Sequence, residues 1–137
     1  MFGNKTIQVP TVFEISGSND TTLKYSIHLV ESKSVHLNRE APNSFNIKSG
    51  DDSILSVVST TNGKLGSSSK IDIEMKPHKE GTTTVTVDCK LYVCSDSGMC
   101  SMKNESFVIT VKVHGMNSGL ANLPSSNNTY NHTLTMA

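Results

Sequence analysis

The chain has 137 residues, and its twelve Lys and Arg balance twelve Asp and Glu, so its formal net charge is zero. This balance excludes the strong overall field that would attract nucleic acid, an anionic membrane or an acidic ligand. No apolar run is as long as a membrane span, and residues Met1 to Lys5 lack the apolar segment of a secretory signal. We therefore expect one cytoplasmic domain with neither a nucleic-acid nor a membrane partner.

The composition favours β structure. Aromatic residues make up only 5 % of the chain and Trp is absent, so a core must consist mainly of Val, Ile and Leu. Ser, Thr and Asn are frequent and supply turns. No long segment has a helical period, which predicts an all-β fold.

The first part of the chain predicts short strands separated by polar connections. Residues 6–9 form the first candidate, which Pro10 would close because proline has no N–H to donate to a sheet. Residues 23–29 alternate apolar and polar side chains, which predicts a strand with one buried face. Residues 31–43 are polar and predict a connection that crosses between two sheets.

Further short strands are predicted towards the middle of the chain. Residues 44–48 and 53–59 are two candidates, separated by a turn that contains Gly and Asp. Residues 60–70 contain Asn-Gly and Gly-Ser-Ser-Ser and predict a flexible loop. Residues 71–75 alternate again, and this strand is expected to stop at Pro77.

The most regular pattern predicts a hairpin between residues 82 and 113. Every second residue is apolar from Val85 to Val93, and again from Phe107 to Val113. A period of two is typical of a strand with one buried face. The segment between the two runs carries Cys94 and Cys100, so we expect two antiparallel strands joined by a long connection.

The order of these elements predicts the domain organisation. About seven short strands with frequent turns favour an immunoglobulin-like antiparallel β-sandwich over residues 1–114, although the Cys and Trp spacing of true immunoglobulin domains is absent. Residues 115–137 contain no Asp, Glu, Lys or Arg and show no apolar period, so we expect a disordered tail.

The positions of the three cysteines along the predicted hairpin indicate different environments for them. Cys89 has the parity of the buried valines and is expected to be a free thiol in the core. Cys94 and Cys100 can be two ordinary thiols, a zinc half-site or a redox pair. Zinc is disfavoured because no second pair of ligands has suitable spacing, and no metal or cofactor is predicted. The nearest charge in the loop is Asp96, which disfavours a thiolate, so slow alkylation near neutral pH is expected.

The other candidate groups carry no specific signal. The histidines are scattered over expected strands and loops, so all five are expected to be solvated; they are His28, His36, His78, His114 and His132. No nucleophile elbow or Gly-rich phosphate loop is present in the sequence.

The cysteine hairpin resembles a known domain. The sequence VTVDCKLYVCSDSGMCSM, residues 85–102, and the strand after it are similar to the C-terminal β domain of NHL-repeat-containing, thioredoxin-like proteins. In that family an alternating strand ends in Tyr-x-Cys, and a short loop leads to a second Cys and another strand. Residues 22–29 and 71–75 also fit the order of its strands, so the resemblance covers roughly residues 6–113. It implies a non-catalytic accessory domain, present as a fragment or short form, that binds the thioredoxin-like and NHL propeller domains.

A narrower resemblance concerns the cysteines alone. The N-terminal immunoglobulin-like domain of bacterial transmembrane thiol:disulfide interchange proteins also has a strand with Tyr, then Cys, five residues including Asp and Gly, and Cys. In that family the pair is a catalytic dithiol/disulfide, which implies thiol/disulfide exchange by Cys94 and Cys100 here. Ser101 and Met102 stand where that family has Pro residues.

Overall fold

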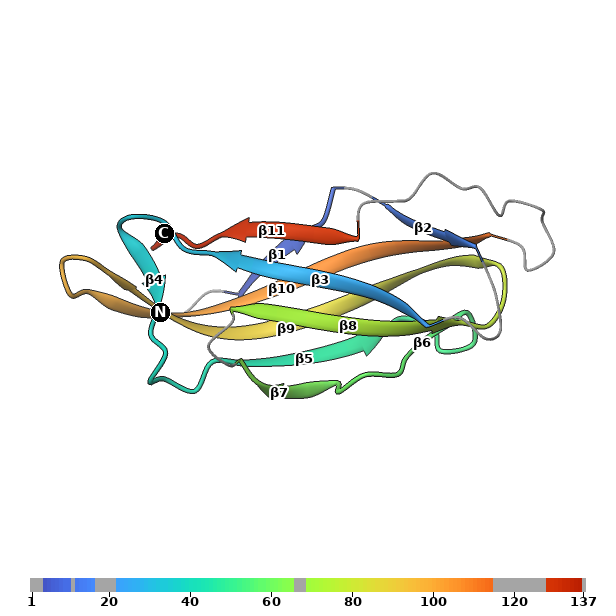
Figure 1. The fold of residues 1–137 in the computed structure, drawn as a ribbon, viewed down its shortest axis with the longest axis horizontal. Helices are drawn as coiled ribbons and strands as arrows, with labels where there is room; N and C mark the ends of the chain where they lie inside the picture. The colour runs from blue at the N-terminus through green and yellow to red at the C-terminus, as the bar shows by residue number, and fades with distance from the viewer. Residues whose placement is uncertain (1–3, 11, 17–21, 66–68, 115–127, 137) are drawn as a thin grey trace.

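The computed structural model describes residues 4–10, 12–16, 22–65, 69–114 and 128–136 of the chain. Within these ranges the protein is all-β, with eleven strands in two stacked sheets. Figure 1 shows the two layers lying along a common long axis. None of these residues belongs to a helix long and apolar enough to cross a membrane. The all-β sandwich expected from the composition is therefore confirmed.

The larger sheet has the strand order β1-β10-β9-β5-β7, with β2 also paired to β10 and β4 also paired to β9. Its strands are β1 (Asn4–Gln8), β2 (Phe13–Ser16), β4 (Val35–Leu37), β5 (Ser44–Ser49), β7 (Asn62–Lys64), β9 (Gly81–Ser95) and β10 (Cys100–His114). The smaller sheet has the order β11-β3-β8-β6. Its strands are β3 (Leu23–Val30), β6 (Leu55–Val57), β8 (Lys70–Pro77) and β11 (Thr129–Thr133).

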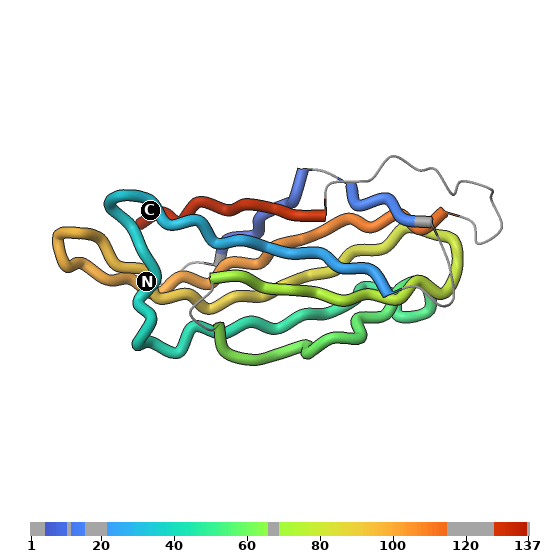
Figure 2. Tube along the Cα trace, in the orientation of Figure 1, coloured from blue at the N-terminus to red at the C-terminus, as the bar shows by residue number. Residues whose placement is uncertain are grey.

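The predicted hairpin is the centre of the larger sheet. Strands β9 and β10 pair antiparallel without a break from Val113↔Gly81 to Cys100↔Cys94. The alternating residues of both strands face the smaller sheet; Val87 and Ile109, for example, are fully buried. The tip of the hairpin, where β9 connects to β10, extends past β4 and beyond the rest of the sandwich (Figures 1 and 2). The hairpin therefore carries core residues along its length and the cysteines at its tip.

The core lies between the two sheets and is built from the apolar positions that alternate along the strands. The smaller sheet contributes fully or almost fully buried side chains that include Tyr25, Ile27, Ile71 and Ile73. They pack against the inner face of β9 and β10, and Phe13 meets Tyr25 edge to face with ring centroids 5.2 Å apart. Each buried aliphatic side chain contributes about 1.5–3 kcal/mol, so these positions supply most of the driving force for folding.

Two stretches that were predicted to be connections each contain a short strand. The polar stretch 31–43 includes β4, which pairs antiparallel with the end of β9. The predicted loop 60–70 includes β7, which pairs with β5, whereas its residues 66–68 lie outside the described ranges. Both strands are three residues long, too short for an alternating pattern to stand out. Their backbone hydrogen bonds depend on a neighbouring strand rather than on their own side chains.

The expected disordered tail is wrong for residues 129–133, while residues 115–127 lie outside the described ranges. Strand β11 pairs parallel with β3, and Leu134, directly after it, is only 2 % exposed. Strands β1 and β2 also pair parallel, both with β10. The sandwich is thus antiparallel at its centre and has parallel strands at its edges. Parallel pairing joins distant segments, so no local sequence pattern indicates it.

Candidate functional site

The tip of the β9–β10 hairpin is closed by a disulfide. Cys94 and Cys100 are paired in register, their Cα atoms are 4.0 Å apart, and they are bonded to each other. The Ser95 N–H donates to the Met99 carbonyl oxygen (2.7 Å), so the cysteines occupy the next, non-hydrogen-bonded pair, where two strands approach most closely. Gly98 has φ +87°, a left-handed conformation that permits the turn.

The two sulfurs differ in their surroundings. Cys94 is 7 % exposed, whereas Cys100 and the loop residues after Ser95 are exposed. Met99, beside Cys100, is 69 % exposed and is the most exposed large apolar side chain of the described residues. A molecule approaching the tip therefore meets Met99 and the Cys100 side of the disulfide first.

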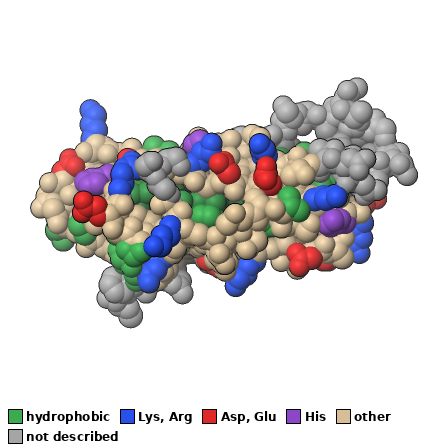
Figure 3. Space-filling model, turned by 60° about the horizontal axis from the view of Figure 1, so that its bottom comes forward, with side chains coloured by type: hydrophobic (Ala, Val, Ile, Leu, Met, Phe, Trp, Pro, Cys, Tyr) green, Lys and Arg blue, Asp and Glu red, His purple; other side chains and the backbone are tan. Residues whose placement is uncertain are grey.

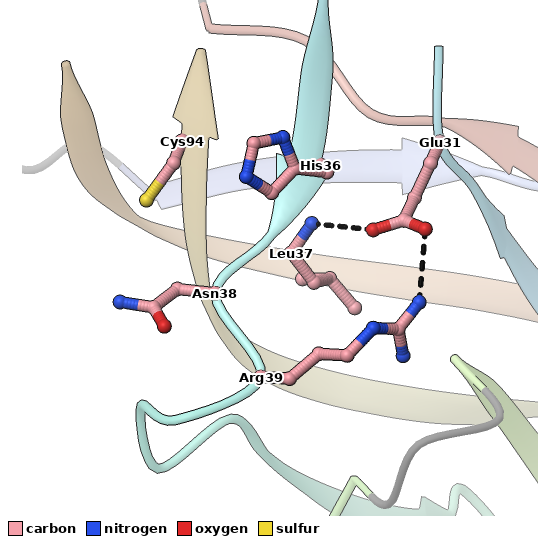
Figure 4. A pocket seen from close by; sticks show the side chains of 6 residues that line it. All are labelled: Glu31, His36, Leu37, Asn38, Arg39 and Cys94. Atoms are coloured by element: carbon pink, nitrogen blue, oxygen red, sulfur yellow. Dashed lines mark hydrogen bonds and ion pairs between the residues drawn. The ribbon is translucent and has the colours of Figure 1, made fainter. Parts of the chain in front are cut away.

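His36 lies next to Cys94, a proximity that the sequence analysis missed. Strand β4 pairs with β9 so that His36 is opposite Cys94. Side chains at paired positions project from the same face of a sheet, and Figure 4 shows the imidazole beside the cysteine. The Asp96 N–H donates to the Ser34 carbonyl oxygen (3.0 Å), which ties the hairpin to the start of β4. The alternation Val35-His36-Leu37 was the only local signal of β4 in the sequence.

An open pocket of about 510 Å³ lies between Cys94 and β4. Its lining residues are Glu31, His36, Leu37, Asn38, Arg39 and Cys94 (Figure 4). One oxygen of Glu31 pairs with Nη2 of Arg39 (2.9 Å), and the other accepts the Leu37 N–H (2.9 Å). A half-exposed ion pair of this kind contributes at most about 1 kcal/mol to stability, so its main effect is to shape the pocket wall.

A second polar cluster lies at the inner face, where Glu105 continues the apolar alternation of β10. This side chain is only 2 % exposed, and Oε2 lies 3.3 Å from Nε2 of His132 on β11. The three facing atoms, both oxygens of Glu105 and Nε2 of His132, have no hydrogen bond within the described structure. The imidazole packs edge to face on Phe107, with centroids 5.0 Å apart.

This cluster corrects the expectation that all histidines are solvated. The side chain of His132 is only 13 % exposed and that of His114 is 19 % exposed, with Nε2 of His114 3.1 Å from Oε1 of Glu14. His36 and His78 are exposed as expected, and His28 is half-buried. A charged residue at an inward position of an alternating strand was the sequence signal for Glu105, and no signal pointed to its partner.

The surroundings of Glu105 shift two pKa values. Burial raises the pKa of the Glu105 carboxyl, but the contact with His132 and the charges of Lys103 and Lys5 outweigh it, so the pKa lies below its ordinary value of 4.5. Burial, with Glu105 and Asp88 nearby, raises the pKa of the Cys89 thiol to about 12. Cys89 is 4 % exposed and free, so the predicted core thiol is confirmed.

The lowered pKa of Glu105 predicts a loss of stability in acid. Since the unfolded carboxyl binds a proton at higher pH than the folded one, the stabilisation is complete above about pH 4.5 and is lost as the pH falls through the folded value. We expect denaturant unfolding to show that the free energy of unfolding falls less steeply below this pH in Glu105→Gln than in the wild type. The stabilisation that the wild type loses in acid is about 1.4 kcal/mol for each unit by which the folded pKa lies below the unfolded pKa. Glu80→Gln, at an exposed position, serves as the control, and equal slopes in all three proteins would contradict the prediction.

Neither cluster forms a metal site: in the part of the chain that the structure describes, no three His, Cys, Asp or Glu side chains lie close enough to hold a metal ion. No protein-family model matches the chain, and no curated protein matches it.

Proposed function

We propose that this chain is a non-catalytic β-sandwich module that binds a protein partner through the disulfide-closed hairpin tip. The observation that carries the proposal is Met99, an apolar side chain 69 % exposed at the end of a projecting, covalently closed loop. A loop that is already ordered loses little conformational entropy on binding. Methionine adapts its shape to a partner surface.

The charges favour a contact of this kind over electrostatic attraction. The chain has no net charge, and on the face shown in Figure 3 the described acidic and basic side chains are interspersed. A partner would therefore be recognised by apolar contact and hydrogen bonds at the tip. The resemblance of the cysteine hairpin to the C-terminal domain of NHL-repeat, thioredoxin-like proteins supports the thioredoxin-like and propeller domains as the partners, in the cytoplasm.

The test is binding to an NHL-repeat, thioredoxin-like protein truncated before its own β domain, measured by calorimetry. Met99→Asp is expected to weaken binding by at least about tenfold, because a charge would be desolvated at the centre of the contact. Val58→Asp is the matched control, since Val58 is 50 % exposed in the connection between β6 and β7, away from the tip. Absence of binding, or equal loss in the two variants, would contradict the proposal.

His36 favours thiol/disulfide exchange as a second candidate function. A substrate thiolate would attack the exposed Cys100 sulfur, breaking the Cys94–Cys100 bond and releasing Cys94 as a thiolate. A protonated His36 beside Cys94 would stabilise this leaving group. A second substrate thiolate would then displace Cys100, leaving an oxidised substrate and a reduced dithiol on the chain.

The exchange function is tested by the rate at which reduced glutathione opens the disulfide. If the pair is catalytic, His36→Gln slows the reaction several-fold near neutral pH, and His28→Gln, on the other sheet, does not. A rate that is unaffected by His36→Gln, together with binding that depends on Met99, favours the interaction module. Fast oxidation of a protein dithiol with no dependence on Met99 favours the enzyme.

A further inference from the structure

Strand β11 forms one edge of the smaller sheet and covers Glu105 and Phe107 of β10; we call the surface that it covers, between β3 and β10, the β11 groove. It lies beside β3 (Figure 1) in parallel register, with Tyr130 opposite Ile27 and His132 opposite Leu29. Along it Asn131 and Thr133 point outward and are exposed, while Tyr130, His132 and Leu134 are buried or half-buried. The Leu134 N–H donates to the carbonyl oxygen of Val30 (2.9 Å), so the pairing continues past the end of the strand.

Beneath β11, strand β10 presents the apolar ring of Phe107 and the carboxylate of Glu105. Phe107, two residues along β10, contacts both rings of β11, with centroids 6.1 Å from Tyr130 and 5.0 Å from His132. Glu105 faces His132 at 3.3 Å, and neither carboxylate oxygen accepts a hydrogen bond from another described residue. A buried carboxylate is costly unless an opposite charge faces it. The groove therefore discriminates in favour of a strand that brings a cation to this position.

We propose that Glu105 is the specificity-determining residue of a strand-binding groove, and that the chain's own residues 129–134 occupy this groove firmly only while His132 is protonated. The inference does not depend on the proposed function, since it concerns the opposite face of β10 from the disulfide.

The other charged groups around Glu105 contribute less than His132, because Lys103 and Lys5 each lower the pKa of the Glu105 carboxyl less than His132 does. Lys103 donates its Nζ hydrogens to the carbonyl oxygen (2.9 Å) and Oγ1 (3.1 Å) of Thr135, so it reinforces the end of β11. Lys5 is opposite Glu105 on β1, and its side chain is exposed. Cys89, opposite on β9, remains a neutral thiol, since its pKa is raised to about 12. The ring of Tyr130 stacks on the imidazole of His132, with ring centroids 6.4 Å apart.

On this proposal β11 is held less firmly in the sandwich as the pH rises. Histidine is the side chain that changes charge between about pH 5 and pH 8. When His132 loses its proton, the Glu105 carboxylate remains buried beside a neutral ring, and opening of the groove restores its hydration. Release of β11 would expose the edge of β3, whose free N–H and C=O groups can pair with a strand from another chain.

The test is hydrogen exchange of the full-length, oxidised chain at about pH 5.5 and about pH 8, corrected for the intrinsic pH dependence of exchange. We expect the protection of residues 129–134 to fall by about tenfold or more at the higher pH, while residues 85–93 in β9 keep theirs. Glu105→Gln removes the charge, and the protection of β11 should then be the same at both pH values.

Two further variants serve as a control for the ion pair and as a test that does not depend on the stability of Glu105→Gln. Glu14→Gln removes the other His–Glu pair of the described residues, between Glu14 on β2 and His114 on β10, and it should leave the pH dependence of β11 as in the wild type. The double variant Glu105→Leu with His132→Phe replaces the pair by apolar side chains, so β11 should stay attached at both pH values even if the single variant folds poorly. The proposal is overturned if wild-type protection of β11 does not depend on pH, or if either Glu105 variant retains the wild-type dependence.

Discussion

Replacing Cys89 with Asp is expected to lower the free energy of unfolding by at least about 3 kcal/mol, because it buries an unpaired carboxylate. The thiol is 4 % exposed, and the position directly opposite on β10 is the buried Glu105, so the new charge would also meet a like charge. Cys89→Ala removes only the sulfur and should cost about 1 kcal/mol.

Denaturant unfolding of the purified variants measures both effects. Lys90→Asp also introduces an aspartate, one residue along β9 where the side chain is exposed, and should change stability by less than about 0.5 kcal/mol. Small and equal effects at positions 89 and 90 would mean that Cys89 does not face the core.

Phe107→Ala is expected to destabilise the protein by about 3–5 kcal/mol, the range for removing a buried aromatic ring. Phe107 is fully buried and contacts Tyr130 and His132, so its loss leaves a cavity under β11. The same variant should loosen residues 129–134 more than the centre of β9, because β9 keeps its other core contacts.

Phe45→Ala is the matched control for the cavity. Phe45 lies at the edge of the core and is only partly buried, so the same truncation should cost clearly less than at Phe107. Thermal unfolding gives the stability difference, and hydrogen exchange gives the local effect on β11. A loss at Phe107 no larger than at Phe45 would contradict the central place of Phe107 in the core.

Several features of the fold could be predicted because they depend only on whether a residue occupies an odd or an even position along its strand. The alternation from Val85 to Val93 decides which side chains of β9 face inward, since successive residues of a strand point to opposite faces. The same argument placed Cys89 in the core and Cys94 on the other face. The resemblance to the NHL-repeat family stays a prediction, because it depends on the same hairpin pattern and no comparison bears on it.

The candidate sites could be predicted only in part. The predicted hairpin places Cys94 and Cys100 in the connection between its two strands, and the structure joins them in a disulfide. His36 was treated as a surface residue because β4 is a three-residue strand inside a polar stretch. Its place beside Cys94 follows from the register of β4 on β9, which is favoured by the burial of Val35 and Leu37 against a distant part of the chain.

The sequence by itself determined the all-β class, the buried face of each long strand and the hairpin that carries the cysteines, because period-two burial is a property of consecutive residues. Only the tertiary structure decided that residues 129–133 form a strand, and that His132 meets Glu105. These features arise from contacts between segments far apart in the chain. A short polar strand becomes stable there because a neighbouring strand satisfies its backbone and a buried charge finds its partner.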